Sequence, residues 1–307
     1  MKKWFLIFYG IASYLILNNC KQDIIVSNSL NESVIKKKLD AFTEVQYGNM
    51  PLIISVPHGG LENPSNISDR NCPNITTTTD SKTIELAQTI DSVCKAKYGF
   101  RPYLVVNYLK RTKLDQNREI SEATCSNNDL SSIWNNYHFS IDTCVAKILQ
   151  KYPQVVFIDL HGHGHSKQRL ELGYLINANE LRNPATILSS STSYYNMLRL
   201  NPMVNSTQFL IANNAFGTLM TNRNFPCVPS AQDNAPAIED PYFDGGFNTQ
   251  KYTSASYPKV YGWQIECNMI GVRDNQNSRI NFAKAFLESI LEFYSKNTNM
   301  LPTTFGK

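Results

Sequence analysis

The chain has no extended block of basic residues and no basic helical pattern. Its 307 residues include 29 Lys or Arg and 25 Asp or Glu, which gives a formal net charge of +4. Lys2 and Lys3 contribute to that charge, so the chain beyond them is closer to neutral. Proteins that bind nucleic acids usually display a basic patch. We therefore expect no nucleic acid as a partner.

Two common signatures of hydrolytic and metal sites are also missing. The chain has no Gly-x-Ser-x-Gly sequence, which would place a nucleophilic serine at the end of a strand. It has no Cys-x-x-Cys pair, which argues against a zinc site made of cysteines. It also has no internal repeat and no clear linker. One domain is the simplest organisation that these absences allow.

Only one long apolar run is present, at the start of the chain. This run, residues 4–17, follows Lys2 and Lys3 and is too short to span a bilayer comfortably. A positive start followed by a short apolar core is typical of a secretory signal peptide. We predict a signal peptide over residues 1–20, with an uncleaved anchor as the alternative. The mature protein is expected outside the cell or in the lumen of the secretory pathway, without stable membrane insertion.

Two further patterns agree with export. Sequons for N-linked glycans begin at Asn31, Asn66, Asn74 and Asn205. An even set of cysteines follows Cys20, which in an oxidising compartment predicts disulfides, although the sequence does not decide the pairing: Cys72, Cys94, Cys125, Cys144, Cys227 and Cys267. Because Cys267 is expected to be bridged, we do not assign it as a nucleophile.

Composition and periodicity predict a single α/β domain over residues 51–307, preceded by a polar leader at 21–50. With 42% apolar residues the chain can bury a large core. Apolar runs rich in β-branched residues predict strands at 52–56, 103–106, 155–161, 172–178 and 260–265. Helical spacing predicts a helix that opens at Asp80 and closes at Gly99, and others at 133–148 and 278–294. Residues 189–257 are expected to form a long loop region that shapes a substrate site.

Histidines follow two of the predicted strands. His58 and His161 each end an apolar run and are each followed by glycine. The carboxyl ends of strands are where open α/β sheets bind ligands, so the two imidazoles are expected to meet. A catalytic zinc ion usually takes three His or carboxylate ligands and leaves one position open. The third ligand is expected to be Asp80, at the start of the next helix, or Glu62, four residues past His58.

Asp159 and Glu266 complete this set of polar residues at strand ends. Asp159 lies on the same side of its strand as His161, so it can orient that imidazole from behind. We assign His163 a similar supporting role. An unpaired carboxylate at the end of an apolar strand is costly, so Glu266 is expected to act as a general base. Its alternative role is an ion pair with an arginine.

A dense polar segment, residues 110–118, follows the strand predicted at 103–106. Arg118 follows Asn117 and could bind a substrate carboxylate through two hydrogen bonds. Arg111 could do the same or polarise a carbonyl group. The alternative is a solvated loop held by salt bridges.

Together these residues resemble the N-formylglutamate amidohydrolase family, which is distantly related to the zinc carboxypeptidases. The resemblance runs from about residue 51 to residue 294 and rests on short stretches that occur in order: 55–60, Asp80 with Thr83, 114–118, 159–163 and 264–266. It implies a phosphorylase/hydrolase-like, three-layer α/β/α fold around a central mixed sheet. It also implies one divalent metal ion, Zn²⁺, and hydrolysis of an amide bond beside a carboxylate.

The resemblance also implies roles for individual residues. His58 and His161 match the metal ligands, and Asp80 is favoured over Glu62 as the third. Asn117 and Arg118 match a clamp for the substrate carboxylate. Apart from the resemblance, we assign Arg111 with Glu266 as a catalytic residue, because it could polarise a carbonyl group. Glu266 matches the general base, which passes a proton from metal-activated water to the leaving nitrogen.

We therefore predict a secreted, zinc-dependent amidohydrolase. Its expected substrate is an N-acyl amino acid or a small peptide that bears a carboxylate. The family members of histidine degradation work inside cells, so N-formylglutamate itself is not the expected substrate of an exported chain. The alternative is a catalytically silent, secreted glycoprotein that binds a ligand and retains the fold. The complete set of metal ligands together with Glu266 favours the enzyme.

Overall fold

A computed structural model describes residues 36–38 and 40–307 of the chain. The chain divides into two units, Met1–Lys37 and Lys38–Lys307. Of the first unit, only Lys36 and Lys37 are described, in the short strand β1 (Lys36–Lys38). The predicted signal peptide, residues 21–35 of the predicted leader and the Asn31 sequon lie outside the described residues.

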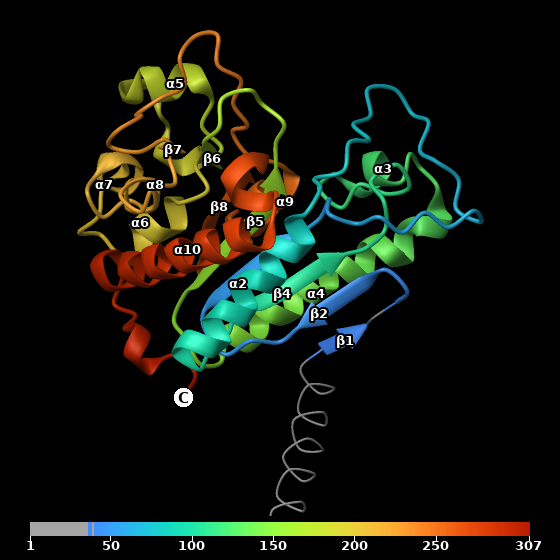
Figure 1. Cartoon of the computed structure of the whole chain (residues 1–307), viewed down its shortest axis with the longest axis horizontal. Coiled ribbons are helices and arrows are strands. Elements are labelled where there is room, and N and C mark those ends of the chain that lie inside the picture. The colour runs from blue at the N-terminus through green and yellow to red at the C-terminus, as the bar shows by residue number, and fades with distance from the viewer. Residues whose placement is uncertain (1–35, 39) are drawn as a thin grey trace, which may run out of the picture. The chain divides into compact units, whose positions relative to one another are not determined.

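The unit Lys38–Lys307 is built on a mixed sheet with the strand order β2-β4-β3-β5-β8-β6-β7 (Figure 1). The four central strands β4, β3, β5 and β8 run parallel, whereas β2 and β6 are antiparallel to their neighbours in this centre. The strands have these bounds: β2 Thr43–Gln46, β3 Leu52–Val56, β4 Tyr103–Asn107, β5 Val155–Gly162, β6 Leu170–Gly173, β7 Cys227–Val228 and β8 Val260–Cys267.

Both faces of the central strands are buried, which explains their near-continuous apolar sequences. In β3, Leu52 and Ile54 belong to one core cluster while Ile53, between them, belongs to another on the opposite face. This alternation follows from the pleat of a strand. Because each strand is covered on two sides, helices must form a layer on either face.

Helices cover both faces, so the predicted three-layer α/β/α architecture is confirmed (Figure 1). One layer contains α2 (Thr83–Tyr98), α6 (Tyr195–Leu200), α7 (Ser206–Ile211), α8 (Phe216–Thr221) and α10 (Gln276–Asn297). The other contains α4 (Ser131–Leu149) and α9 (Phe247–Tyr252). The remaining described helices are short: α3 Ile120–Ala123, α5 Ala178–Arg182, a π-helical turn at Met269–Arg273, and 3-10 turns at Asn128–Leu130, Pro184–Thr186, Ser189–Ser191 and Pro302–Thr304. Within residues 36–38 and 40–307, no helix is long and apolar enough to cross a membrane.

Element boundaries differ from the sequence-based prediction at several places, including residues 189–257, where the expected long loop contains α6, α7, α8, β7 and α9. β2 lies inside the stretch 21–50 that the sequence presented as a polar leader, and the compact unit begins at Lys38. The strand predicted at 172–178 is instead Leu170–Gly173. Helix α2 begins at Thr83 rather than at Asp80. Asp80 does not cap this helix with its side chain, because the Asp80 carboxylate is bonded to His161.

The expectation of several disulfides is wrong for the described cysteines. Cys72 and Cys125 form a disulfide. Cys94, Cys144, Cys227 and Cys267 are buried free thiols. Each of these four lies in an apolar core cluster, with Cys144 on the opposite side of the sheet from the other three. Small apolar side chains are common in such cores, so their even number carried no pairing information.

Candidate active site

Three residues from separate segments meet at the carboxyl ends of β3 and β5. The Nδ1 atoms of His58 and His161 are 3.2 Å apart. The Asp80 Oδ2 atom lies 2.9 Å from Nδ1 of His161 and 3.5 Å from Nδ1 of His58. The Asp80 amide also donates to the His58 carbonyl, which ties the loop before α2 to the end of β3. All three side chains are buried.

The spacing of these donor atoms fits a metal ion. Two ligands bound tetrahedrally to zinc at about 2.1 Å stand roughly 3.4 Å apart. The three separations of 2.9, 3.2 and 3.5 Å lie close to that value. Glu62, the other predicted third ligand, is exposed and does not join this group.

A carboxylate stands behind each imidazole. Asp115 Oδ1 lies 2.6 Å from Nε2 of His58, and Asp159 Oδ2 lies 2.9 Å from Nε2 of His161. Ionised carboxylates only accept hydrogen bonds, so each Nε2 carries the proton and donates it. The two Nδ1 atoms are thereby turned toward each other and toward Asp80. Carboxylates behind metal-binding histidines fix the ring in this way.

The group is therefore built around a positive charge. Burial alone would lower the pKa of His161, but Asp159 and Asp80 hold that pKa well above its ordinary value. Burial would raise the pKa of Asp80, yet hydrogen bonds from His161 and His58 keep it below its usual range. The charge can be a proton on His161 or a divalent cation between the three side chains, and binding of the cation would displace the proton.

A second group of possible metal ligands contains His163, His165 and Glu171. The His163 Nε2 donates to the Arg169 carbonyl, and its Nδ1 accepts from the His165 amide. The His165 Nδ1 bonds Glu171 at 2.8 Å. These hydrogen bonds satisfy the group without a cation, so its chemistry does not call for a metal. His163 was predicted to support the metal ligands. Its ring instead bonds the Arg169 carbonyl and the His165 amide, within this second group.

Glu266 lies beside the three residues. It is paired in register with His161 on the neighbouring strand, so the two side chains project from the same face. Its carboxyl is buried and accepts a hydrogen bond from Gln264. Burial raises the pKa of Glu266 to about 8, with Asp80 and Glu171 adding to the rise and His161 opposing it. A buried carboxyl whose pKa lies near neutrality can both take up and release a proton.

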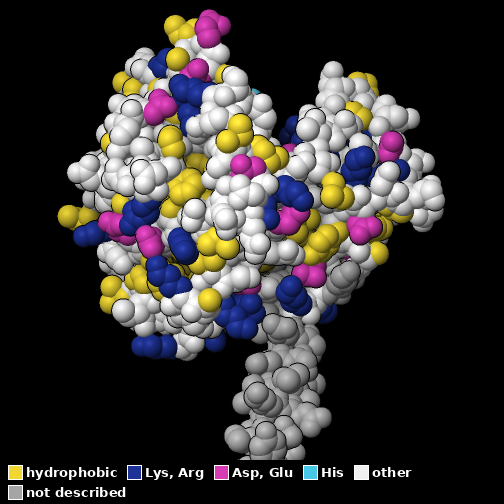
Figure 2. All heavy atoms as spheres, viewed as in Figure 1, with side chains coloured by type: hydrophobic (Ala, Val, Ile, Leu, Met, Phe, Trp, Pro, Cys, Tyr) yellow, Lys and Arg dark blue, Asp and Glu magenta, His cyan; other side chains and the backbone are white. Residues whose placement is uncertain are grey.

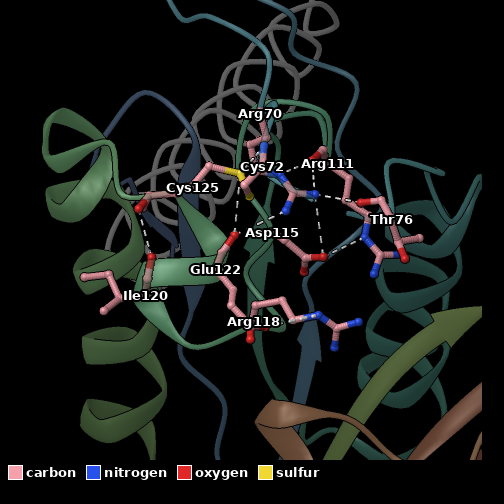
Figure 3. The surroundings of a disulfide bond; sticks show 10 residues. Arg70, Cys72, Thr76, Arg111, Asp115, Arg118, Ile120, Glu122 and Cys125 are labelled. Carbon is pink, nitrogen blue, oxygen red and sulfur yellow. Dashed lines mark hydrogen bonds and ion pairs between the residues drawn. A yellow bond between two sulfur atoms is a disulfide. The ribbon is translucent and has the colours of Figure 1, made fainter. Parts of the chain in front are cut away.

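Arg111 of the polar segment lies in a buried network next to the disulfide (Figure 3). Arg111 Nε donates to Asp115 Oδ2 at 2.9 Å, so it supports the carboxylate behind His58. Burial would raise the pKa of Asp115, but His58 and Arg111 hold it well below the ordinary range. Arg70, which the sequence did not single out, donates to the Arg111 carbonyl through Nε and a terminal nitrogen.

Asn117 and Arg118, which were predicted to act together, lie in different environments. Asn117 is buried, with Nδ2 3.3 Å from Nε2 of His161 and Oδ1 accepting from the Asn248 amide. Gly246 packs so closely against Asn117 that a Cβ at position 246 would lie 2.4 Å from Asn117 Nδ2. Arg118 is partly exposed and lines a cleft. Of this pair, only Arg118 lines the cleft, where it also pairs with Glu122 at 4.0 Å.

This cleft has a volume of about 820 Å³ and runs between α3 and the region 189–257. One wall contains Arg118 and Glu122, and the other contains residues 244–247 and Gln250. Figure 2 shows a hollow between the lobe that carries α5 and the lobe that carries α3. The long region thus supplies much of this cleft. His58, Asp80 and His161 do not line it; the connection runs through Gly246 in the wall, which packs on Asn117, and Asn117 contacts His161.

Two residues missed at the sequence level support the group, Asp115 by its hydrogen bond to His58 and Arg70 through its contacts with Arg111 and Asp115. Asp115 was visible only as one charge in a polar segment, and no sequence pattern singled out Arg70. Both bury their side chains in contact with Arg111. An acidic residue within a charged stretch can indicate a functional carboxylate, but only the fold shows that Asp115 faces His58.

No protein-family model matches the chain, and no curated protein matches it in sequence. Solved structures do match. N-formylglutamate amidohydrolase from Ralstonia eutropha JMP134 has a TM-score of 0.51 and 12% identity, covering 84% of this chain and 99% of that one. A gene product from Agrobacterium tumefaciens has a TM-score of 0.51 and 11% identity, covering 83% and 96%. Succinylglutamate desuccinylase from Chromobacterium violaceum has a TM-score of 0.40 and 13% identity, covering 87% and 69%.

These similarities show the fold. The chain shares the α/β/α architecture of N-formylglutamate amidohydrolase over most of both chains. The resemblance predicted from short motifs is thereby confirmed for the fold. At 12% identity, a comparison of whole sequences does not reveal this similarity.

Proposed function

We propose that this protein is a zinc-dependent amidohydrolase. The observation that carries the proposal is the group of His58, Asp80 and His161, whose donor atoms lie 2.9 to 3.5 Å apart with a carboxylate behind each imidazole. These three residues would hold the ion. When bound, zinc would polarise an amide carbonyl and lower the pKa of water. The likeness in fold to N-formylglutamate amidohydrolase supports this class of reaction.

Glu266 is the proposed acid and base. Its carboxylate takes a proton from the attacking water, and its carboxylic acid then gives that proton to the leaving nitrogen as the C–N bond breaks. The raised pKa of about 8 supports both steps, because the proton is held neither too weakly nor too strongly. Asp115 and Asp159 orient the two imidazoles, and Arg111 fixes Asp115.

The proposed substrate is an N-acyl amino acid or a small peptide that bears a carboxylate. Arg118 is the residue at the cleft that can pair with such a group. A cleft of about 820 Å³ is near the upper end of the range for small-molecule sites, so an acylated peptide also fits. The apolar run behind Lys2 and Lys3 supports secretion, and the exposed sequons at Asn66 and Asn74 are compatible with glycosylation.

Metal content and hydrolysis test the proposal together. Wild-type protein purified without chelators is compared with His58→Ala, His161→Ala, Glu266→Gln and, as a matched control, His165→Ala from the second histidine group. We expect about one zinc per chain in the wild type, none in the first two variants, and full content in the last two. Glu266→Gln should lose hydrolysis of N-acyl amino acids and acylated peptides. A wild type that takes up no metal overturns the proposal. Metal uptake without hydrolysis of any of these substrates supports the silent binding protein instead.

A further inference from the structure

A chain of buried hydrogen bonds connects helix α4 to His161. The Tyr137 hydroxyl on α4 lies 2.7 Å from Oγ of Ser55 on β3. Ser55 Oγ donates to Asp159 Oδ1 on β5 at 2.8 Å. The other oxygen of Asp159 lies 2.9 Å from Nε2 of His161. Tyr137, Ser55 and Asp159 have no exposed surface. Three elements from different parts of the sequence thus meet in one line of contacts.

The hydroxyl hydrogens of Tyr137 and Ser55 have only one arrangement that satisfies this series of hydrogen bonds. A carboxylate accepts, so the single hydroxyl hydrogen of Ser55 is used on Asp159. Ser55 must then accept from Tyr137, whose hydroxyl therefore donates. Each donor in the chain strengthens the next, because polar groups in a buried chain polarise one another. Asn248 Nδ2 adds a longer contact of 3.4 Å to the same Asp159 oxygen.

The arrangement holds both oxygens of Asp159. One oxygen is occupied by His161 and the other by Ser55, so the carboxylate cannot rotate without losing a buried hydrogen bond. A fixed carboxylate fixes the plane of the His161 ring. The ring plane in turn decides where its Nδ1 lone pair points, which is toward Asp80 and His58.

The two imidazoles are held by different chemistry. Asp115, behind His58, is anchored by the charged Arg111. Asp159, behind His161, is anchored by the two neutral hydroxyls of Ser55 and Tyr137 and by the amide of Asn248. No Lys or Arg among the described residues is bonded to Asp159. The hydroxyl chain is therefore the main support on this side of the group.

We propose that Ser55, and Tyr137 acting through it, are positioning residues for the metal centre, which they serve by locking Asp159 behind His161. This inference rests on the proposed function, because it assumes that His161 binds zinc. Partners that orient metal-binding histidines typically change metal affinity by about 10- to 100-fold. Removal of the Ser55 hydroxyl should therefore weaken zinc binding even though Ser55 never touches the ion.

Zinc affinity, measured by competition with a coloured chelator, tests the inference. We expect Ser55→Ala to weaken binding about tenfold, at the lower end of the range for such partners, and Tyr137→Phe to weaken it less. Ser140→Ala is the matched control. Ser140 is equally buried on α4, but its hydroxyl donates to the Asn136 carbonyl within the helix. Ser140→Ala should leave zinc affinity unchanged even if it alters stability.

A double-substitution cycle separates positioning from general disturbance. If Ser55 acts through Asp159, then Ser55→Ala should cause no further loss once Asp159→Asn is present. Equal losses in both backgrounds overturn the inference, as does a Ser55→Ala affinity within twofold of wild type. Tyr137→Phe carries the test if Ser55→Ala does not fold, and an affinity equal to wild type then overturns it. A wild type that binds no zinc overturns the proposed function itself, so the two failures are distinguishable.

Discussion

At the scale of single residues, the site depends on which nitrogen of each imidazole faces inward. His58 and His161 both turn Nε2 to a buried carboxylate and Nδ1 to Asp80. An imidazole alone has no preference strong enough to ensure this. Asp115 and Asp159 impose it, because an acceptor behind the ring requires a protonated Nε2. The chemistry at the centre is therefore set by residues that do not reach it.

Close contact at Gly246 gives a prediction at this scale. A Cβ there would lie 2.4 Å from Nδ2 and 2.9 Å from Oδ1 of Asn117, which contacts His161. Gly246→Ala should displace Asn117, weaken zinc binding and cost about 1–3 kcal/mol of stability, as overpacking usually does. Zinc affinity and denaturant unfolding provide the measurements.

Gly164→Ala is the control for this prediction. It lies near the histidines in sequence, but a Cβ there meets nothing within 4 Å. Its zinc affinity and stability should match the wild type. If Gly246→Ala behaves like Gly164→Ala, the contact with Asn117 does not constrain the site.

At the scale of elements, helices α4 and α9 meet around the buried His138. Its Nδ1 lies 2.8 Å from the Tyr252 hydroxyl. Burial and the nearby Lys251 hold the pKa of His138 well below its ordinary value, so this ring stays neutral in the folded protein. In the unfolded chain it takes up a proton below about pH 6.5. The unfolded state then binds more protons, so stability falls as the pH decreases.

This difference predicts the pH dependence of unfolding. His138 should contribute a loss of up to about 1.4 kcal/mol per pH unit below about pH 6.5, and no pH dependence well above it. His138→Gln should therefore show a shallower decline of the unfolding free energy between about pH 6.5 and 5. Curves for the two proteins that remain parallel over this range would contradict the assignment.

The disulfide Cys72–Cys125 connects two further segments, the loop before α2 and the turn after α3. It spans 53 residues of sequence, and closing a loop of that size reduces the entropy of the unfolded chain. Replacing both cysteines with serine should cost about 4 kcal/mol of stability. Denaturant unfolding with and without a reductant measures the effect.

The reductant supplies the internal control. It should lower the stability of the wild type toward that of the double variant and leave the double variant unchanged. Equal stability of the two proteins without reductant would show that the bond contributes nothing to the fold.

Sequence patterns predicted the long elements and missed the short ones. The strands Leu52–Val56 and Val260–Cys267 and the helix Ser131–Leu149 have apolar periods long enough to indicate their type. Helices of four to six residues, such as α3 and α7, are marginal in isolation and owe their existence to tertiary contacts. The start of α2 was misplaced because Asp80 bonds His161 instead of capping the helix.

At the scale of the whole molecule, the site combines residues from distant parts of the sequence. The rule that strand ends meet at one edge of a sheet was sufficient to bring His58, His161 and Glu266 together. It could not identify Asp115 or Ser55, whose roles depend on which side chains approach from neighbouring segments. Sequence thus predicted the innermost residues of the site, while their supports required the structure.

The same assembly would couple metal binding to stability. Zinc held by His58, Asp80 and His161 would connect the ends of β3 and β5 with the segment before α2, and an unfolded chain offers no such preformed site. Free zinc at 100 times its dissociation constant should therefore raise the unfolding free energy by about 2.7 kcal/mol. Glu266→Gln should show the same increase, since that residue is assigned to proton transfer. His58→Ala should show none. An equal increase in His58→Ala would mean that zinc binds elsewhere, and the three residues would then be a hydrogen-bonded group centred on the His161 proton.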